Sequence, residues 1–169
     1  DRIVTWCHRN GVEILTYGSA KYPARLREME DPPIVLYCRG KLPAMDDRIT
    51  VGVVGTRKAS VYGMTSAKRL GYQIAACGGT VVSGMATGID GVCAAGALMA
   101  KGYTVAVLGS GPDIIYPPHH KLLSRQIQKN GVLISEYPPG TPSYKWNFPA
   151  RNRIISGISN GVLVVEAPQ

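Results

Sequence analysis

The stretch 144–153, Tyr-Lys-Trp-Asn-Phe-Pro-Ala-Arg-Asn-Arg, mixes aromatic residues with lysine and arginine. Its Phe148 is the only phenylalanine of the chain. Aromatic rings that stack on bases, beside cations that hold phosphates, are the usual components of single-stranded nucleic-acid binding sites. Packing is the alternative role for such rings. We expect Phe148 to stack on a base, and we expect Trp146 to pack beneath a sheet ahead of the helix.

Small residues follow several apolar segments of the sequence. They are Gly55-Thr56-Arg57, Ser83-Gly84, Gly109-Ser110-Gly111 and Ser135-Glu136. Such turns let backbone N–H groups approach an anion, and the following helix adds the positive end of its dipole. Phosphate binding is one interpretation, and tight turns without a ligand are the other. Neither the dinucleotide fingerprint nor the P-loop pattern is complete, because Ile114 replaces the third glycine of the first and GxxxxGK[ST] is absent.

Groups for catalysis are sparse. After Met85 the acidic residues all lie at or soon after expected strand ends: Asp90, Asp113, Glu136 and Glu166. Each could act as a base, but a role in capping a helix or supporting a loop is favoured. His119 and His120 have no further ligand cluster, and no GxSxG nucleophile motif is present. The sequence therefore predicts binding rather than catalysis, with no metal and no cofactor.

Short β-rich segments alternate with segments of helical length, and these must position the candidate residues. We expect strands over 49–54, 80–82, 103–108, 131–134 and 161–165, and helices over 60–77, 89–101, 119–130 and 150–159. This alternation predicts an α/β fold with a doubly wound, mainly parallel sheet and right-handed crossovers. Ligands of such sheets bind outside the carboxyl ends of the strands, where the small-residue turns lie.

The first part of the chain has a different pattern, with a strand over 13–17, a helix over 23–29 and a strand over 34–38. We expect residues 1–47 to be an N-terminal extension packed on the same sheet, and residues 48–169 to be the core. The sequence starts without methionine and stops after an expected strand. We therefore expect a piece of a longer protein, truncated at its C-terminus.

Composition narrows the classes of function. Of the 169 residues, 45% are hydrophobic and 18% charged, which excludes a disordered chain. No apolar run approaches the roughly 18 residues of a membrane span, and no signal peptide is visible, so we expect a cytoplasmic protein without membrane contact. Four cysteines without a CxxC pair should be reduced and mostly buried.

The formal net charge is +8, and its placement suggests a positive face. Residues 48–89 and 114–135 contain basic residues and no Asp or Glu. A basic surface without any ligand is the plain alternative, but nucleic acid or another polyphosphate is the favoured partner.

Five motifs occur in one order along the chain: Val54-Gly55-Thr56-Arg57, then Ser83-Gly84-Met85-Ala86-Thr87-Gly88-Ile89-Asp90, then Gly109-Ser110-Gly111-Pro112-Asp113, then Ser135-Glu136-Tyr137-Pro138-Pro139-Gly140, then Phe148-Pro149-Ala150-Arg151-Asn152-Arg153. This series resembles the DNA-processing protein family called DprA or Smf. The resemblance implies an extended Rossmann-like fold and a non-enzymatic homodimer. Such a protein binds single-stranded DNA, protects it, and loads the RecA recombinase in natural transformation.

The resemblance carries DNA contact over to Arg57, Lys145 and Phe148, with backbone anion contacts at Ser83, Gly84, Gly109, Ser110 and Gly111. We add Ser60, Arg151 and Arg153 to the expected DNA-binding residues. The expected loop-supporting residues are Asp90, Asp113, Glu136 and Asn152. The chain departs from the family at Cys93-Ala94, where Ala-His is usual, so any role of that histidine is in doubt here.

An enzyme is the competing hypothesis. A phosphoribohydrolase acting on a nucleoside monophosphate can use a related Rossmann-like sheet. Such enzymes carry PGGxGTxxE, which couples a phosphate loop to a glutamate. The nearest string here, Pro138-Pro139-Gly140-Thr141, has no glutamate after it.

Overall fold

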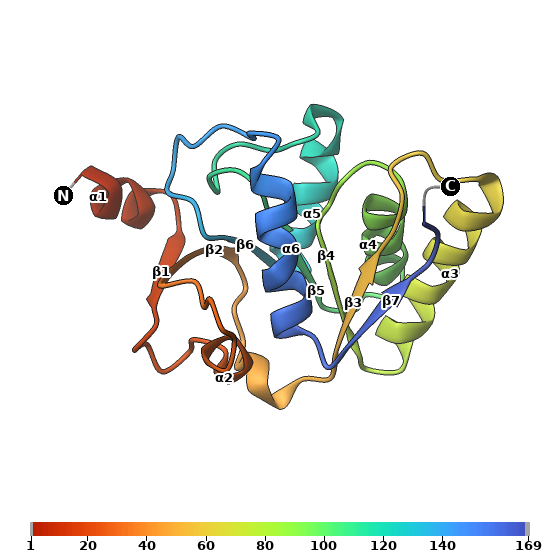
Figure 1. Ribbon diagram of the computed structural model, residues 1–169, viewed down its shortest axis with the longest axis horizontal. Helices are drawn as coiled ribbons and strands as arrows, with labels where there is room; N and C mark the ends of the chain where they lie inside the picture. The colour runs from red at the N-terminus through yellow and green to blue at the C-terminus, as the bar shows by residue number, and fades with distance from the viewer. Residues whose placement is uncertain (1, 168–169) are drawn as a thin grey trace.

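The computed structural model describes residues 2–167, which form one seven-stranded sheet with helices on both faces (Figure 1). In sheet order the strands are β1 (Val12–Thr16), β2 (Val35–Gly40), β6 (Gly131–Ser135), β5 (Thr104–Leu108), β4 (Thr80–Ser83), β3 (Thr50–Val54) and β7 (Gly161–Val164). The strands from β6 to β7 in this order run parallel to one another. The fold class is thus confirmed: an α/β fold with a doubly wound, mainly parallel, Rossmann-like sheet.

The N-terminal strands join the same sheet. β2 pairs with β6 in antiparallel orientation, with Cys38 opposite Ile134, and β1 adds to the free edge of β2. Tyr22 is fully buried beneath this part of the sheet and donates a hydrogen bond to the Pro33 carbonyl oxygen. Residues 12–40 therefore extend the sheet on the side away from β7.

The helices form two layers. α3 (Val61–Ala76), α4 (Ile89–Met99) and α5 (Lys121–Asn130) cover one face, and α6 (Asn147–Ile158) crosses the other (Figure 1). The short α2 (Ala24–Arg27) packs beside α6 through Leu26. α1 (Arg2–Arg9) lies next to β1, and the single-turn 3-10 helices η1 (Met45–Asp47) and η2 (Pro118–His120) connect elements.

Burial on both faces explains the apolar runs of the central strands. Every residue of β5 and of β6 is buried. On the α6 side, Ile154, Ile155 and Ile158 pack against strand residues such as Val105. A sheet covered on both faces leaves no position for polar alternation, which is why these strands are mostly apolar along their whole length.

The order of the strands creates a reversal beside β3. The chain moves from β3 through β4 and β5 to β6, and then returns along α6 to place β7 on the other side of β3. α6 therefore lies on the opposite face from α3 and α4. The carboxyl ends of β3 and β4 then open between these layers, and this is where doubly wound sheets bind ligands.

Three expectations about elements need correction or refinement. α6 begins at Asn147, before the expected start at position 150, because Pro149 lies in the first turn, where no backbone N–H is needed. The helix expected over 119–130 is divided into η2 and α5. α1 was not expected at all.

The cysteines are free, and Cys77 is exposed while the other three are buried.

Candidate nucleic-acid interface

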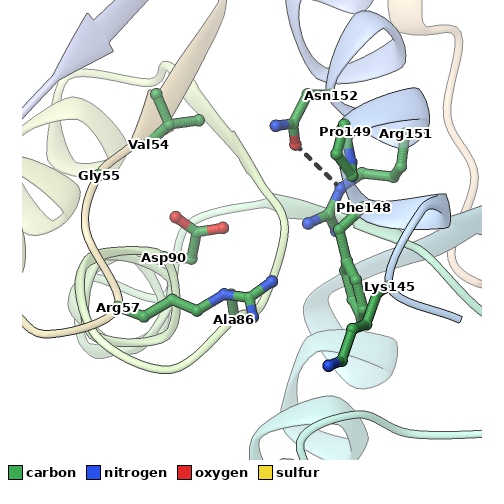
Figure 2. A pocket seen from close by; sticks show the side chains of 10 residues that line it. All are labelled: Val54, Gly55, Arg57, Ala86, Asp90, Lys145, Phe148, Pro149, Arg151 and Asn152. Carbon is green, nitrogen blue, oxygen red and sulfur yellow. Dashed lines mark hydrogen bonds between the residues drawn. The ribbon is translucent and has the colours of Figure 1, made fainter. Parts of the chain in front are cut away.

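A cleft of about 280 Å³ opens at the carboxyl ends of the central strands (Figure 2). Its lining residues are Val54, Gly55, Arg57, Ala86, Asp90, Lys145, Phe148, Pro149, Arg151 and Asn152. The loop after β3 and the turn after β4 form one wall, and the start of α6 forms the other. The residues come from segments nearly 100 positions apart, so the cleft exists only in the folded chain.

Arg57 and Lys145 are two cations that line this cleft. Both are exposed, and within residues 2–167 neither charged group has a hydrogen-bond or ion-pair partner. Figure 2 shows Arg57 extending from the loop after β3 toward the ring of Phe148, while Lys145 lies on the α6 side. Two unpaired cations facing one cleft can both bind phosphate groups.

The Arg57 loop is held in place by a glycine in the neighbouring turn. Gly88 has φ 85°, and a Cβ atom there would lie 2.5 Å from the Thr56 carbonyl oxygen. Only glycine adopts this conformation at low cost and lets the two loops approach so closely. The turn after β4 therefore supports the loop that carries Arg57.

Phe148 is half-buried and partly enclosed. The Arg57 guanidinium carbon lies 5.0 Å from the ring centroid, which is a cation–π contact, and the Tyr116 ring lies 5.3 Å away. Gly109 lies below the ring, since a Cβ atom at that position would be 3.0 Å from it. Gly109 thus makes room for Phe148, and only part of the ring remains accessible to a base.

Arg151 is buried beneath the cleft. Its guanidinium donates hydrogen bonds to the carbonyl oxygens of Gly84 and Val107, and it thereby ties α6 to the ends of β4 and β5. Asp90 accepts a hydrogen bond from the Gly84 amide at 3.1 Å. Burial raises the pKa of Asp90, whereas the charge of Arg151 opposes that rise. Burial likewise lowers the pKa of Arg151.

Arg153 is partly exposed and is paired with two acidic residues. Its guanidinium makes an ion pair with Glu136 at 2.6 Å and another with Asp31 at 3.2 Å. The hydrogen bond with Glu136 is the main cause of its raised pKa. Arg153 thus joins α6 to the end of β6 and to the segment before β2, and DNA contact by this residue stays a prediction.

The serine and glycine groups that were predicted to contact DNA make hydrogen bonds within the protein. The Ser83 hydroxyl donates to the Val53 carbonyl oxygen, and that of Ser110 donates to the Ile114 carbonyl oxygen. The Gly111 amide donates to Thr141, and the Gly84 amide is taken by Asp90. These groups shape the loops around the cleft, and their direct contact with DNA stays a prediction.

Ser60 lies outside the cleft. Its hydroxyl accepts a hydrogen bond from the Gly63 amide and donates one of 2.7 Å to the Glu166 carboxylate. The hydrogen bond from the Ser60 amide, followed by that from its hydroxyl, lowers the pKa of Glu166. Ser60 therefore caps α3 and fastens it to the segment after β7.

Two of the expected loop-supporting residues make hydrogen bonds near the cleft. Asp113 accepts a hydrogen bond of 2.9 Å from the Gly140 amide, which joins the loops after β5 and β6. Asn152 accepts one of 3.2 Å from the Arg151 guanidinium, drawn as a dashed line in Figure 2.

The expectation that Trp146 packs beneath the sheet is wrong. Its side chain is 70% exposed, and its ring stacks on that of Tyr144. The proline-rich loop 138–146 carries these rings out of the core. Sequence reasoning also missed Tyr116 and Asn147. The buried Asn147 side chain donates a hydrogen bond to the Gly109 carbonyl oxygen. A polar residue directly before an aromatic residue gives no signal for such a role.

The position of the family's usual histidine is apolar here. Cys93 and Ala94 are both buried in α4 and pack in hydrophobic clusters. In residues 2–167 no group of three or more histidine, cysteine or acidic side chains could hold a metal ion. No helix in the same range is long and apolar enough to span a bilayer.

Comparison with known proteins places these features in a family context. The model of the family described as DNA recombination-mediator protein A matches residues 13–169. DNA processing protein DprA of Bacillus subtilis is 38% identical over 168 residues, which cover 99% of this chain and 57% of that protein. The chain thus spans little more than half the length of this relative.

Two solved structures share the fold. DNA processing protein A from Streptococcus pneumoniae superposes with a TM-score of 0.86 at 34% identity, covering 97% of this chain and 57% of that one. The protein from Helicobacter pylori, described for its single-stranded DNA binding mode, superposes with a TM-score of 0.81 at 31% identity. It covers 92% of this chain and 70% of that one.

Proposed function

The chain belongs to the DNA recombination-mediator protein A family, and from that premise we propose that it binds single-stranded DNA in the cleft between the β3 loop and α6. The observation that carries the proposal is the position of two cations, Arg57 and Lys145, on either side of a partly exposed phenylalanine ring. Neither cation has a hydrogen-bond or ion-pair partner among the described residues. This combination holds phosphates by charge and one base by stacking.

Single strands suit this cleft better than a duplex. The cations that line the cleft with Phe148, Arg57 and Lys145, lie in loops and not on a helix that could enter a major groove. A ring that stacks accepts any base, so little sequence preference is expected. The structure from Helicobacter pylori supports the same ligand class, because that protein binds single-stranded DNA.

The decisive experiment compares three ligands at a series of salt concentrations. Fluorescence anisotropy would measure binding of a single-stranded oligonucleotide, its duplex, and a nucleoside monophosphate. We expect the single strand to bind most tightly and its affinity to fall as salt rises, because phosphate contacts release counterions. Equal or tighter binding of the duplex across the titration would contradict the proposal. Binding and cleavage of the monophosphate would favour the phosphoribohydrolase alternative.

The family also suggests a finer function. We propose that the protein has no catalytic activity of its own, works in the cytoplasm as a homodimer, protects incoming single strands, and loads RecA on them. The description of the family as a recombination mediator supports this role. A RecA ATPase assay on single-stranded DNA at limiting RecA would test it. The protein should raise the rate, and no change at any concentration would overturn the loading role.

A further inference from the structure

The two aromatic residues that flank Lys145 form an exposed stack. The ring centroids of Tyr144 and Trp146 are 4.8 Å apart, and their planes differ by 6°. The Tyr144 side chain is 44% exposed and that of Trp146 is 70% exposed. Neither residue belongs to a hydrophobic cluster of the core. Large aromatic residues are highly buried on average, so an exposed tryptophan on a tyrosine needs an explanation.

The stack is already arranged for another flat partner. Tyr144 covers one face of the Trp146 ring, which leaves the opposite face open to solvent. Contact with Tyr144 limits the rotamers of the indole, so less side-chain entropy is lost when a ligand stacks on it. Bases bind such faces whatever their sequence.

The position of the stack relates it to the cleft. Lys145 lies between the two residues in the chain and lines the cleft, while Phe148 follows in the first turn of α6. The Phe148 ring is crowded by Arg57, Tyr116 and the backbone at Gly109. The open face of Trp146 therefore offers a base more accessible surface than Phe148 does.

We propose that Tyr144 and Trp146 form a second base-stacking platform, on which the strand places a base outside the cleft while Lys145 holds a phosphate. This inference rests on the proposed function and goes beyond it. It assigns base contact to a residue outside the cleft, next to the cation that both sites share. The strand would then run from the Arg57 side, across Phe148, and out over Trp146.

Intrinsic fluorescence tests the platform directly. The chain contains two tryptophans, and Trp6 is far along the sequence on α1. In a Trp6→Phe background the signal comes from Trp146 alone. Addition of unlabelled oligothymidylate should quench this signal with the same midpoint as binding measured by anisotropy. A labelled strand that binds without quenching would overturn the inference and leave the proposed function intact. Absence of any binding would overturn both.

Mutation and a modified ligand separate stacking from charge. Trp146→Ala should weaken single-strand binding by about 5–150-fold, the range that base stacking gives, without changing the salt slope. Trp146→Phe should restore most of the affinity. An oligonucleotide of abasic residues, which keeps the phosphates, should bind wild type and Trp146→Ala equally. A loss of the same size with the abasic strand would overturn the inference.

Two controls guard against indirect effects. Tyr72→Ala removes another half-exposed aromatic ring, on α3, and should leave binding unchanged. The Trp146→Ala protein should melt within about 2 °C of wild type, because an exposed ring contributes little to stability. A normal Trp146→Ala affinity in a folded protein would count against the platform.

Discussion

At the residue scale, the three arginines in and around the cleft have different roles because their environments differ. Arg57 is exposed and unpaired in the described chain, Arg151 is buried with carbonyl oxygens, and Arg153 is paired with carboxylates. A cation that is already paired must lose that pairing before it binds phosphate. We therefore expect the free cations to make the proposed DNA contacts, whereas the paired arginines position the helix.

The free cations should each contribute one phosphate contact. We expect Arg57→Ala and Lys145→Ala to lower single-strand affinity and to reduce the slope of log K against log salt by roughly 0.7 each. The melting temperatures should not change. Lys129→Ala, an exposed lysine at the far end of α5, is the matched control and should leave the slope unchanged. Binding of Arg57→Ala within twofold of wild type would remove Arg57 from the site.

Phe148 should affect both binding and stability. Phe148→Ala should weaken single-strand binding by about 5–150-fold without changing the salt slope. The ring is half-buried, so its loss should cost about 2 kcal/mol of stability, less than the roughly 3–5 kcal/mol of a core phenylalanine. Thermal melts and anisotropy titrations measure the two effects. A badly destabilised variant with normal binding would mean that Phe148 is only a core residue.

Arg151 should matter for stability, and its loss should make stability depend on pH. Arg151→Met leaves the buried Asp90 without an opposing charge and should cost about 3–5 kcal/mol. Without Arg151 the pKa of Asp90 should rise further above its unfolded value. Stability is then retained below the unfolded pKa of about 3.9 and lost as pH rises through the folded pKa. Urea unfolding at several pH values measures this.

Arg153→Met is the control for that experiment. It removes the partly exposed ion pairs with Glu136 and Asp31 and should cost about 1 kcal/mol, with no added loss toward neutral pH. If Arg151→Met were as stable as Arg153→Met at pH 7, the buried role of Arg151 would be wrong.

At the element scale, the helices are fastened to the sheet by single polar side chains. Arg151 ties α6 to β4 and β5, and Ser60 ties α3 to the segment after β7. Both connections converge on the β3 end of the sheet, on either side of the Arg57 loop. Polar contacts near the starts of α3 and α6 therefore fix the segments around this end of the sheet, while apolar contacts hold the rest of each helix.

Loss of the Ser60 cap should weaken α3 in a pH-dependent way. Ser60→Ala should cost about 1 kcal/mol at pH 7, as the loss of an N-cap residue does. The lowered pKa of Glu166 adds stability above its unfolded pKa of about 4.3, and this is lost as pH falls through the folded pKa. The difference between wild type and Ser60→Ala should therefore shrink in acid. A constant difference from pH 7 to pH 3 would contradict the link to Glu166.

At the scale of the whole molecule, the sheet joins the N-terminal strands to the part that carries the cleft. β2 contributes Leu36 and Cys38 to the same core cluster as Ile134 and Ile154. An extension that shares a core should not unfold separately.

The described chain should therefore unfold as one cooperative unit. In a Trp146→Phe background, Trp6 fluorescence and far-UV circular dichroism should give the same unfolding midpoint. Leu36→Ala should cost about 2–5 kcal/mol and lower both midpoints together. Two separated transitions would show that residues 1–47 are an independent unit.

The alternation of apolar runs and helical segments determined the fold class, since strands buried on both faces need such sequences. The turns with small residues likewise indicated which edge of the sheet carries the cleft. The boundaries of the elements were harder to predict from the sequence. Pro149 suggested that the helix starts after this proline, whereas the proline lies in the first turn of α6. The motif of aromatic and basic residues pointed to a segment that lines the cleft, but not to the surroundings of each side chain.

Those roles depend on what each side chain meets in space. Arg151 is buried among carbonyl oxygens and therefore connects α6 to the sheet. Arg153 forms ion pairs with Glu136 and Asp31, which are distant from it in sequence. A tryptophan has the same local pattern whether it packs inside or stacks outside, so only the path of the loop before α6 decided that Trp146 is exposed. Local sequence sets the propensity and period of the backbone, whereas charge pairing and ring exposure depend on residues brought together by the fold.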